Sequence, residues 1–82
     1  MTSEAVLSPA QCRGARGLLG WTQAELAIAA AVAVKTIADF EGMKRSPYAR
    51  TLRDVRSALE KAGIVFIAPN GGGPGVRLRV AP

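Results

Sequence analysis

The 82-residue sequence predicts a mainly α-helical domain of four to five helices, followed by a two-stranded β-hairpin. Over residues 8–63, apolar residues recur at helical spacing between signals that start and stop helices. After Gly63 the pattern changes to β-branched, aromatic and alternating residues, which are typical of strands. The length fits one small domain, and 49% apolar residues are enough for a compact core.

The first helix is predicted to begin after Ser8 and to run to about Leu19. Ser8 and Gln11 have the spacing of a capping box, and Pro9 between them favours the first helical position. Gly20 has the residue type that often ends a helix. The side chains expected to face inward are Cys12, Ala15, Leu18 and Leu19.

The run Thr22–Gly42 predicts two short helices joined by a tight apolar corner. Thr22 and Glu25 form a second capping box, so we expect helices over about residues 23–30 and 34–41. Small residues at the corner allow the two crossing backbones to approach closely. This is the sequence pattern of a helix-turn-helix, whose second helix can lie in the major groove of DNA.

A fourth helix is predicted over about residues 49–62, and Gly63 ends it. We expect Tyr48 to pack near its start. Its apolar residues recur at helical spacing and are Leu52, Val55, Ala58 and Leu59.

Two predicted strands, at residues 64–67 and 76–80, flank a glycine-rich turn and form the hairpin. An isolated hairpin is marginal in water, so we expect this one both to pack on the helices and to pair with a second chain. The chain is thus divided into a DNA-binding domain (residues 1–63) and a hairpin (residues 64–82). The candidate dimerisation residues are Ile64, Phe66, Val76, Leu78 and Val80.

The composition argues against several classes of protein. With no histidine and a single cysteine, Cys12, we expect no disulfide framework and no metal site. No nucleophile, base or metal ligand occurs at catalytic spacing, so we expect no enzyme activity and no cofactor. The length leaves no separate domain for a small-molecule ligand. We find no signal peptide and no apolar stretch of membrane length, and we expect a cytoplasmic protein without membrane contact.

The net charge of +5 favours a polyanionic partner. Most of it lies in residues 44–63, where six basic and two acidic side chains give +4. Within that segment Lys44, Arg45 and Arg50 are the candidates for binding DNA phosphates. A solvated basic surface with no nucleic-acid partner is the alternative interpretation.

The helix-turn-helix region also carries a set of motif residues: Gln23, Leu26, Ala27, Val32, Thr36, Ile37 and Glu41. With them the chain resembles the phage-repressor-like helix-turn-helix regulators, of the Cro/repressor or xenobiotic-response-element type, over roughly residues 8–63. Its tail is similar to a C-terminal extension of short bacterial regulators of this type. The chain differs from the pattern at the corner, where Ala31 replaces glycine, and at the next helix cap, where Ala33 replaces Ser or Thr. Gly42 comes one residue early, so that Met43 has the usual place of a glycine.

The resemblance implies a role for each exposed residue of the third helix. Those that would read base edges are Val34, Lys35, Thr36 and Asp39. Lys35 would donate to guanine and Val34 would contact a thymine methyl group. Asp39 would either accept from cytosine or repel phosphate and so disfavour wrong registers. Gln23 would bind a phosphate at the start of the second helix. Glu41 would pair with Arg16 and organise the fold.

These observations together predict sequence-specific binding of double-stranded DNA by a small homodimeric transcriptional regulator, a repressor or autoregulator of bacterial type. The alternative is a protein-interaction module of the same repressor-like fold, of the antitoxin or anti-repressor kind. The apolar segment Ala30–Val34 and the hairpin edges would suit that alternative.

Overall fold

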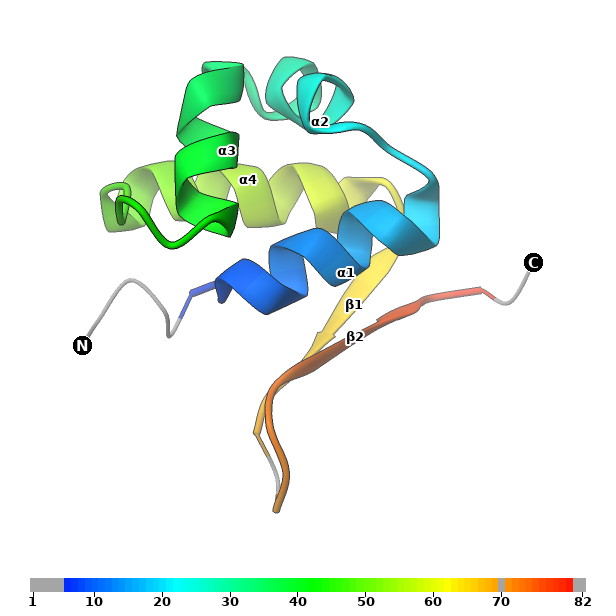
Figure 1. The fold of residues 1–82 in the computed structure, drawn as a ribbon. Coiled ribbons are helices and arrows are strands. Elements are labelled where there is room, and N and C mark those ends of the chain that lie inside the picture. The colour runs from blue at the N-terminus through cyan, green and yellow to red at the C-terminus, as the bar shows by residue number, and fades with distance from the viewer. Residues whose placement is uncertain (1–5, 70, 81–82) are drawn as a thin grey trace.

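A computed structural model of the chain describes residues 6–69 and 71–80, and in these ranges it has four helices and a C-terminal hairpin (Figure 1). The predicted mainly helical fold with a terminal two-stranded hairpin is confirmed. Asn70, in the predicted turn, lies outside the described residues. The elements in order are α1 (Pro9–Leu19), α2 (Gln23–Ala30), α3 (Val34–Glu41), α4 (Ala49–Lys61), β1 (Ile64–Ile67) and β2 (Gly75–Leu78).

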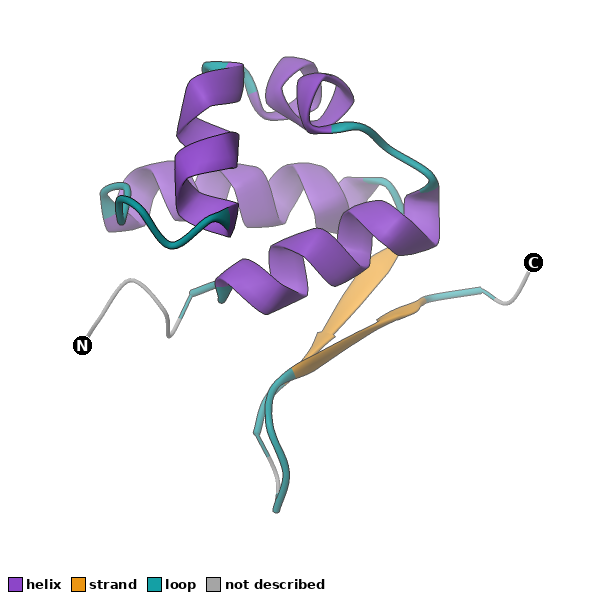
Figure 2. Cartoon of the chain, in the orientation of Figure 1, coloured by secondary structure: helices purple, strands orange, loops and turns teal. Residues whose placement is uncertain are grey.

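The arrangement has three levels. Helices α1 and α4 lie in the middle, α2 and α3 lie on one side of them, and the hairpin lies on the other (Figures 1 and 2). The hairpin contacts α1 through β2 and α4 through β1. Helices α2 and α3 are therefore separated from the hairpin by the middle pair of helices.

The helix starts follow the two predicted capping boxes. The Ser8 hydroxyl accepts from the Gln11 N–H at 3.0 Å, and the Thr22 hydroxyl accepts from the Glu25 N–H at 3.0 Å. In each box a second hydrogen bond runs the other way. The Gln11 side-chain oxygen accepts from the Ser8 N–H, and the Glu25 carboxylate accepts from the Thr22 N–H. Gly20 ends α1 with φ of +69°, which glycine adopts without steric cost.

One hydrophobic core joins all the elements. Every helix contributes fully buried or nearly buried apolar side chains, and β1 contributes Ile64. The largest fully buried side chains are Leu7, Leu26, Ile37, Leu52, Leu59, Ile64, Val55 and Cys12.

Two predicted core contacts are wrong. Leu18 is 44% exposed, because it lies about 100° around the helix from Leu19 and therefore at the edge of the inner face. Tyr48 is 85% exposed. It is the extended residue before α4, and Leu52, one turn later, fills the adjacent core position instead.

The hairpin packs one face on the helices. In the antiparallel register Ile64 pairs with Leu78 and Phe66 with Val76, and these four side chains belong to the core or pack against it. The Gln11 side chain donates to the Gly75 carbonyl at 3.1 Å. The strand β2 ends at Leu78, earlier than predicted, and Val80 beyond it is exposed.

Two non-glycine residues adopt left-handed backbone conformations. Ala31 has φ of +58° at the corner after α2, and Met43 has φ of +59° after α3. These are the two positions at which the resemblance places glycine. Gly42 itself has φ of −84°, which any residue adopts. The chain therefore carries avoidable backbone strain at both positions.

We expect Ala31→Gly and Met43→Gly each to raise the free energy of unfolding by about 1 kcal/mol, because glycine relieves the left-handed strain. Urea denaturation followed by circular dichroism measures the change. The control is Ala29→Gly, at an exposed site within α2, which is expected to lose up to about 1 kcal/mol. Equal losses at positions 29 and 31 would contradict the strain argument.

Candidate nucleic-acid interface

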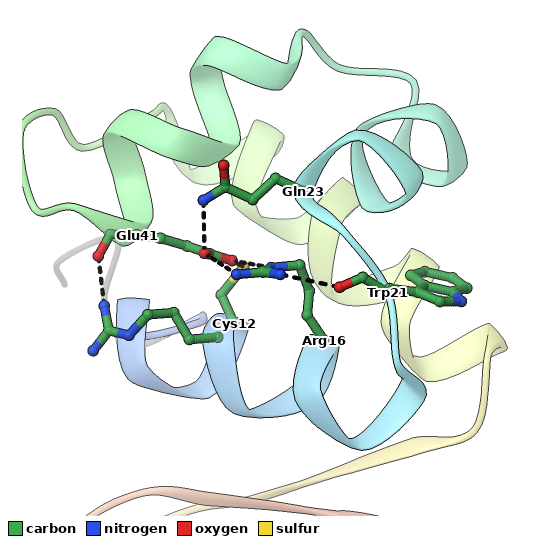
Figure 3. Close-up of polar contacts among 6 residues, drawn as sticks. Cys12, Arg16, Trp21, Gln23 and Glu41 are labelled. Atoms are coloured by element: carbon green, nitrogen blue, oxygen red, sulfur yellow. Dashed lines mark hydrogen bonds and ion pairs between the residues drawn. The ribbon is translucent and has the colours of Figure 1, made fainter.

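A buried carboxylate joins the first three helices. Glu41, at the end of α3, is 4% exposed, and its oxygens accept from Arg16 Nε at 2.7 Å and Arg16 Nη2 at 2.6 Å (Figure 3). Cys12 Sγ and Gln23 Nε2 each donate to the same carboxylate at 3.0 Å. The guanidinium of Arg16 also donates to the Trp21 carbonyl at 3.0 Å, which ties the loop after α1 to this cluster.

Glu41 and Arg16 of this cluster stay ionised. Burial alone would raise the pKa of Glu41, but hydrogen bonds from Arg16, Gln23 and Cys12 outweigh it and hold that pKa below its usual range. The bond to Glu41 raises the pKa of Arg16. Burial, together with the bond to Glu41, raises the pKa of the Cys12 thiol, which therefore remains protonated and unreactive. The Arg16–Glu41 pairing that the resemblance implied is confirmed.

The Gln23 side chain makes a contact that was not predicted. Its side-chain amide, expected to bind a phosphate, donates to the Glu41 carboxylate and so links the start of α2 to the end of α3. Arg13, expected to face outward, is exposed but donates to the Glu41 main-chain carbonyl. Sequence reasoning missed both contacts, because they join residues 18 and 28 positions apart.

The predicted base-reading residues lie on the solvent side of α3. Val34 and Lys35 are exposed, while Thr36 and Asp39 are half-buried. Lys35 Nζ lies 3.1 Å from Asp39 Oδ2, one turn along the helix. The lysine side chain of this pair is 82% exposed, so the lysine can exchange this partner for another at small cost.

A groove of about 400 Å³ runs between α3 and the segment that leads into α4. Three predicted base-reading residues and the predicted phosphate ligand Arg45 line it together. The full lining is Val32, Ala33, Lys35, Thr36, Asp39, Arg45, Pro47, Tyr48 and Thr51.

Tyr48 is the residue of this surface that sequence reasoning missed as a site residue. Its ring is almost entirely exposed and lines the groove beside Lys35 and Asp39. An aromatic ring with a hydroxyl group can contact both the apolar and the polar parts of a ligand. The feature of the sequence that could have identified Tyr48 as a site residue is its position directly before α4, in the loop that carries Lys44 and Arg45.

Exposed cations lie along the chain between α3 and the first turn of α4, and one of them, Arg45, lines the groove. Lys44, Arg45 and Arg50 are exposed, and within the described residues no acidic side chain forms an ion pair with any of them. Arg56, in contrast, pairs with Glu60 at 3.3 Å, donates to the Val6 carbonyl and stacks over Phe66. Arg56 is therefore a structural residue.

Two other kinds of site receive no support from the structure. In residues 6–69 and 71–80, potential metal-ligating side chains do not gather in groups of three or more. No helix in that part of the chain is long and apolar enough to cross a membrane.

Comparisons with known proteins give no assignment. No protein-family model matches the chain, and a search of curated proteins finds no similar sequence.

Proposed function

We propose that this chain is a sequence-specific double-stranded DNA-binding protein that regulates transcription, with α2 and α3 as its helix-turn-helix. The observation that carries the proposal is the shared groove. Lys35, Thr36 and Asp39 line it together with Arg45, and two further exposed cations, Lys44 and Arg50, are chain neighbours of the lining residues Arg45 and Thr51. A helix that presents short polar side chains beside unpaired cations suits base edges flanked by phosphates.

The connection between α2 and α3 supports this assignment. Three residues, Ala31 to Ala33, separate the two helices, and the Val32 N–H donates back to the Ala27 carbonyl at 3.0 Å. The buried Leu26 and Ile37 hold the helices together from the inside. The Glu41 cluster fixes the far end of α3, so α3 is presented as a rigid element.

The side chains of α3 offer a small set of base contacts. Lys35 would donate to guanine O6 and N7, Val34 would contact a thymine methyl group, and Asp39 would accept from cytosine N4. Tyr48, across the groove, adds an aromatic contact. With so few polar groups, DNA shape supplies part of the specificity.

We expect Lys35→Ala to weaken binding by about 10- to 100-fold, because a good base contact contributes about 1–3 kcal/mol of discrimination. The ligand is a duplex that the wild-type protein selects from a random-sequence library, and fluorescence anisotropy measures the affinity. On an unselected duplex the same variant is expected to lose much less.

The control is Lys61→Ala, which removes an exposed lysine at the C-terminal end of α4, whereas the groove lies at the start of that helix. It is expected to leave binding of the selected duplex nearly unchanged. If Lys35→Ala binds the selected duplex as tightly as the wild type, α3 does not read bases through this residue. If no sequence is enriched at all, the proposed function itself fails.

The alternative function, a protein-interaction module, has one specific observation in its favour. Ile28 is 81% exposed, and the hollow beside the end of α2 has a mixed lining of Ala29, Ala30, Ala31, Asp54, Ser57, Ala58 and Lys61. An exposed isoleucine beside such a hollow can contribute to the binding of another protein. Binding that is insensitive to salt, with no enriched DNA sequence, would favour this alternative.

A further inference from the structure

The hairpin has an outer face that is turned away from the helices. Side chains alternate between the two faces of a strand, and the inner face packs on the helices through Ile64 and Phe66 of β1. Val65 is half-buried on the outer face, and the other side chains of that face are exposed. The outer side chains are Val65, Ile67, Arg77 and Arg79. This face is therefore the part of the hairpin that its own chain leaves uncovered.

The register of the hairpin arranges these side chains in two rows. Val65 lies opposite Arg77, and a glycine lies opposite Ile67. The Arg79 N–H donates to the Gly63 carbonyl at 2.7 Å, so the pairing continues beyond the end of β2. Neither glycine places a side chain on the face, which leaves Ile67 and Arg79 open to a partner. The outer face thus has an apolar end and a cationic end.

The charge of the cationic end is not balanced within the chain. From residue 61 to the end, the sequence has three basic residues and no acidic one. Among the described residues, neither Arg77 nor Arg79 forms an ion pair. A guanidinium group can bind a carboxylate through two parallel hydrogen bonds. Because residues two apart on a strand are separated by about 7 Å, the face offers two carboxylate sites at that spacing.

We propose that the outer face of the hairpin binds an extended acidic segment of another protein. In an extended segment, the side chains that point to one side are also two residues and about 7 Å apart. A segment that lies along the strands therefore places two carboxylates on Arg77 and Arg79 and an apolar side chain on Ile67. The required pattern is one apolar and two acidic residues, with one residue of any type between successive members.

The composition and the position of this face favour a protein partner over DNA. Protein interfaces combine apolar side chains with arginine, whereas a DNA backbone offers phosphates that have no use for Val65 and Ile67. The hairpin also lies on the opposite side of α1 and α4 from α3 (Figure 1). A segment bound to the outer face therefore leaves the groove beside α3 open. The inference goes beyond the proposed function, because the chain would hold DNA and a protein at the same time.

An NMR titration of the isotope-labelled full chain tests the inference with a defined probe. The probe is the end-blocked peptide Leu-Thr-Glu-Thr-Glu-Thr, which carries the required pattern. We expect it to shift the main-chain amide signals of residues 63–67 and 75–79 and to leave those of residues 33–51 in place. In the isomer Leu-Thr-Thr-Glu-Glu-Thr the two carboxylates point to opposite sides of an extended chain. We expect this isomer to bind about threefold more weakly, because only one carboxylate can face the arginines.

A matched pair of charge variants tests which cations bind the peptide. Arg77→Gln with Arg79→Gln removes both carboxylate sites, and we expect it to raise the peptide dissociation constant about tenfold. Lys44→Gln with Arg45→Gln removes the same charge from the loop after α3. This control is expected to change the dissociation constant by less than about twofold, because salt screens distant charges. Circular dichroism verifies that both variants fold.

The inference is overturned if no hairpin signal shifts at about 1 mM peptide, a concentration that detects even weak binding. It is also overturned if the two peptides bind equally or if both charge variants lose the same affinity, since either result would mean attraction by overall charge. A hairpin variant that retains the peptide but has a smaller salt slope on duplex DNA would assign the face to nucleic acid instead. The peptide results need no DNA, so this inference and the proposed function fail separately.

Discussion

Glu41→Ala is expected to lower the free energy of unfolding by about 3–5 kcal/mol, the range found when a buried ion pair loses one partner. The substitution leaves the guanidinium of Arg16, the amide of Gln23 and the thiol of Cys12 without their shared acceptor. The free energy of unfolding of a domain of this size is only a little larger than this loss. The variant is therefore expected to be partly unfolded at 37 °C. Urea denaturation, with Trp21 fluorescence as the probe, measures the loss in the free energy of unfolding.

Two controls separate the buried cluster from an ordinary ion pair. Glu60→Ala breaks the partly exposed pair with Arg56 and is expected to cost less than about 1 kcal/mol. Replacing both members of the buried pair, in Arg16→Met with Glu41→Leu, is expected to cost less than Glu41→Ala alone, because no unpaired charge remains. Equal losses for Glu41→Ala and Glu60→Ala would contradict the role of the cluster.

The same carboxylate gives the stability a pH dependence of known sign. The folded protein holds the pKa of Glu41 below its usual value, so the unfolded chain binds this proton more readily. The resulting stabilisation is fully present above the pKa of a free glutamate, about 4.3. It is lost as the pH falls through the lower, folded-state pKa. The stability difference between wild type and Glu41→Gln is therefore expected to narrow only under acidic conditions.

Local signals were sufficient to predict the boundaries of the helices. A capping box acts between residues three positions apart, and Gly20 acts on the turn directly before it. Such information is contained in short stretches of sequence. The starts of α1 and α2 were therefore predicted correctly to the residue.

Side-chain environments that depend on packing between elements were predicted less well. Leu18 and Tyr48 have residue types that favour burial, but their positions relative to other elements leave them exposed. The hydrogen bond from Gln23 to Glu41 was not predicted, because nothing local shows that Glu41 lies beside it. The division of the hairpin into an inner and an outer face also depended on how it packs on α1 and α4.

The candidate site was predictable in its residues but not in its shape. The exposure of Lys35, Lys44, Arg45 and Arg50 follows from helical spacing and from their place in a polar loop. The groove lies between α3 and the start of α4, and its form depends on the loop that joins them. The place of Tyr48 in the groove follows from the same loop.

Neutralising the three exposed cations of the loop after α3 and the first turn of α4 is expected to have the largest effect on DNA affinity. In Lys44→Gln with Arg45→Gln and Arg50→Gln, we expect the dissociation constant to rise about a hundredfold at 0.1 M salt. The slope of log affinity against log salt is expected to fall by about 2.7 in magnitude, because each lost phosphate contact removes about 0.9. Anisotropy titrations over a range of salt concentrations measure both quantities on the selected duplex.

The matched control removes the same amount of charge elsewhere, at Lys61, Arg77 and Arg79, which are exposed at the end of α4 and on the hairpin. Both triple variants reduce the formal net charge equally, so long-range attraction to DNA weakens to a similar extent. Only contacts within a few ångströms of phosphates release condensed counterions and change the slope. If both variants lower the slope equally, Lys44, Arg45 and Arg50 have no special role and the chain binds DNA through its overall charge. If the slope falls only for the groove variant, the phosphate-binding surface lies beside α3.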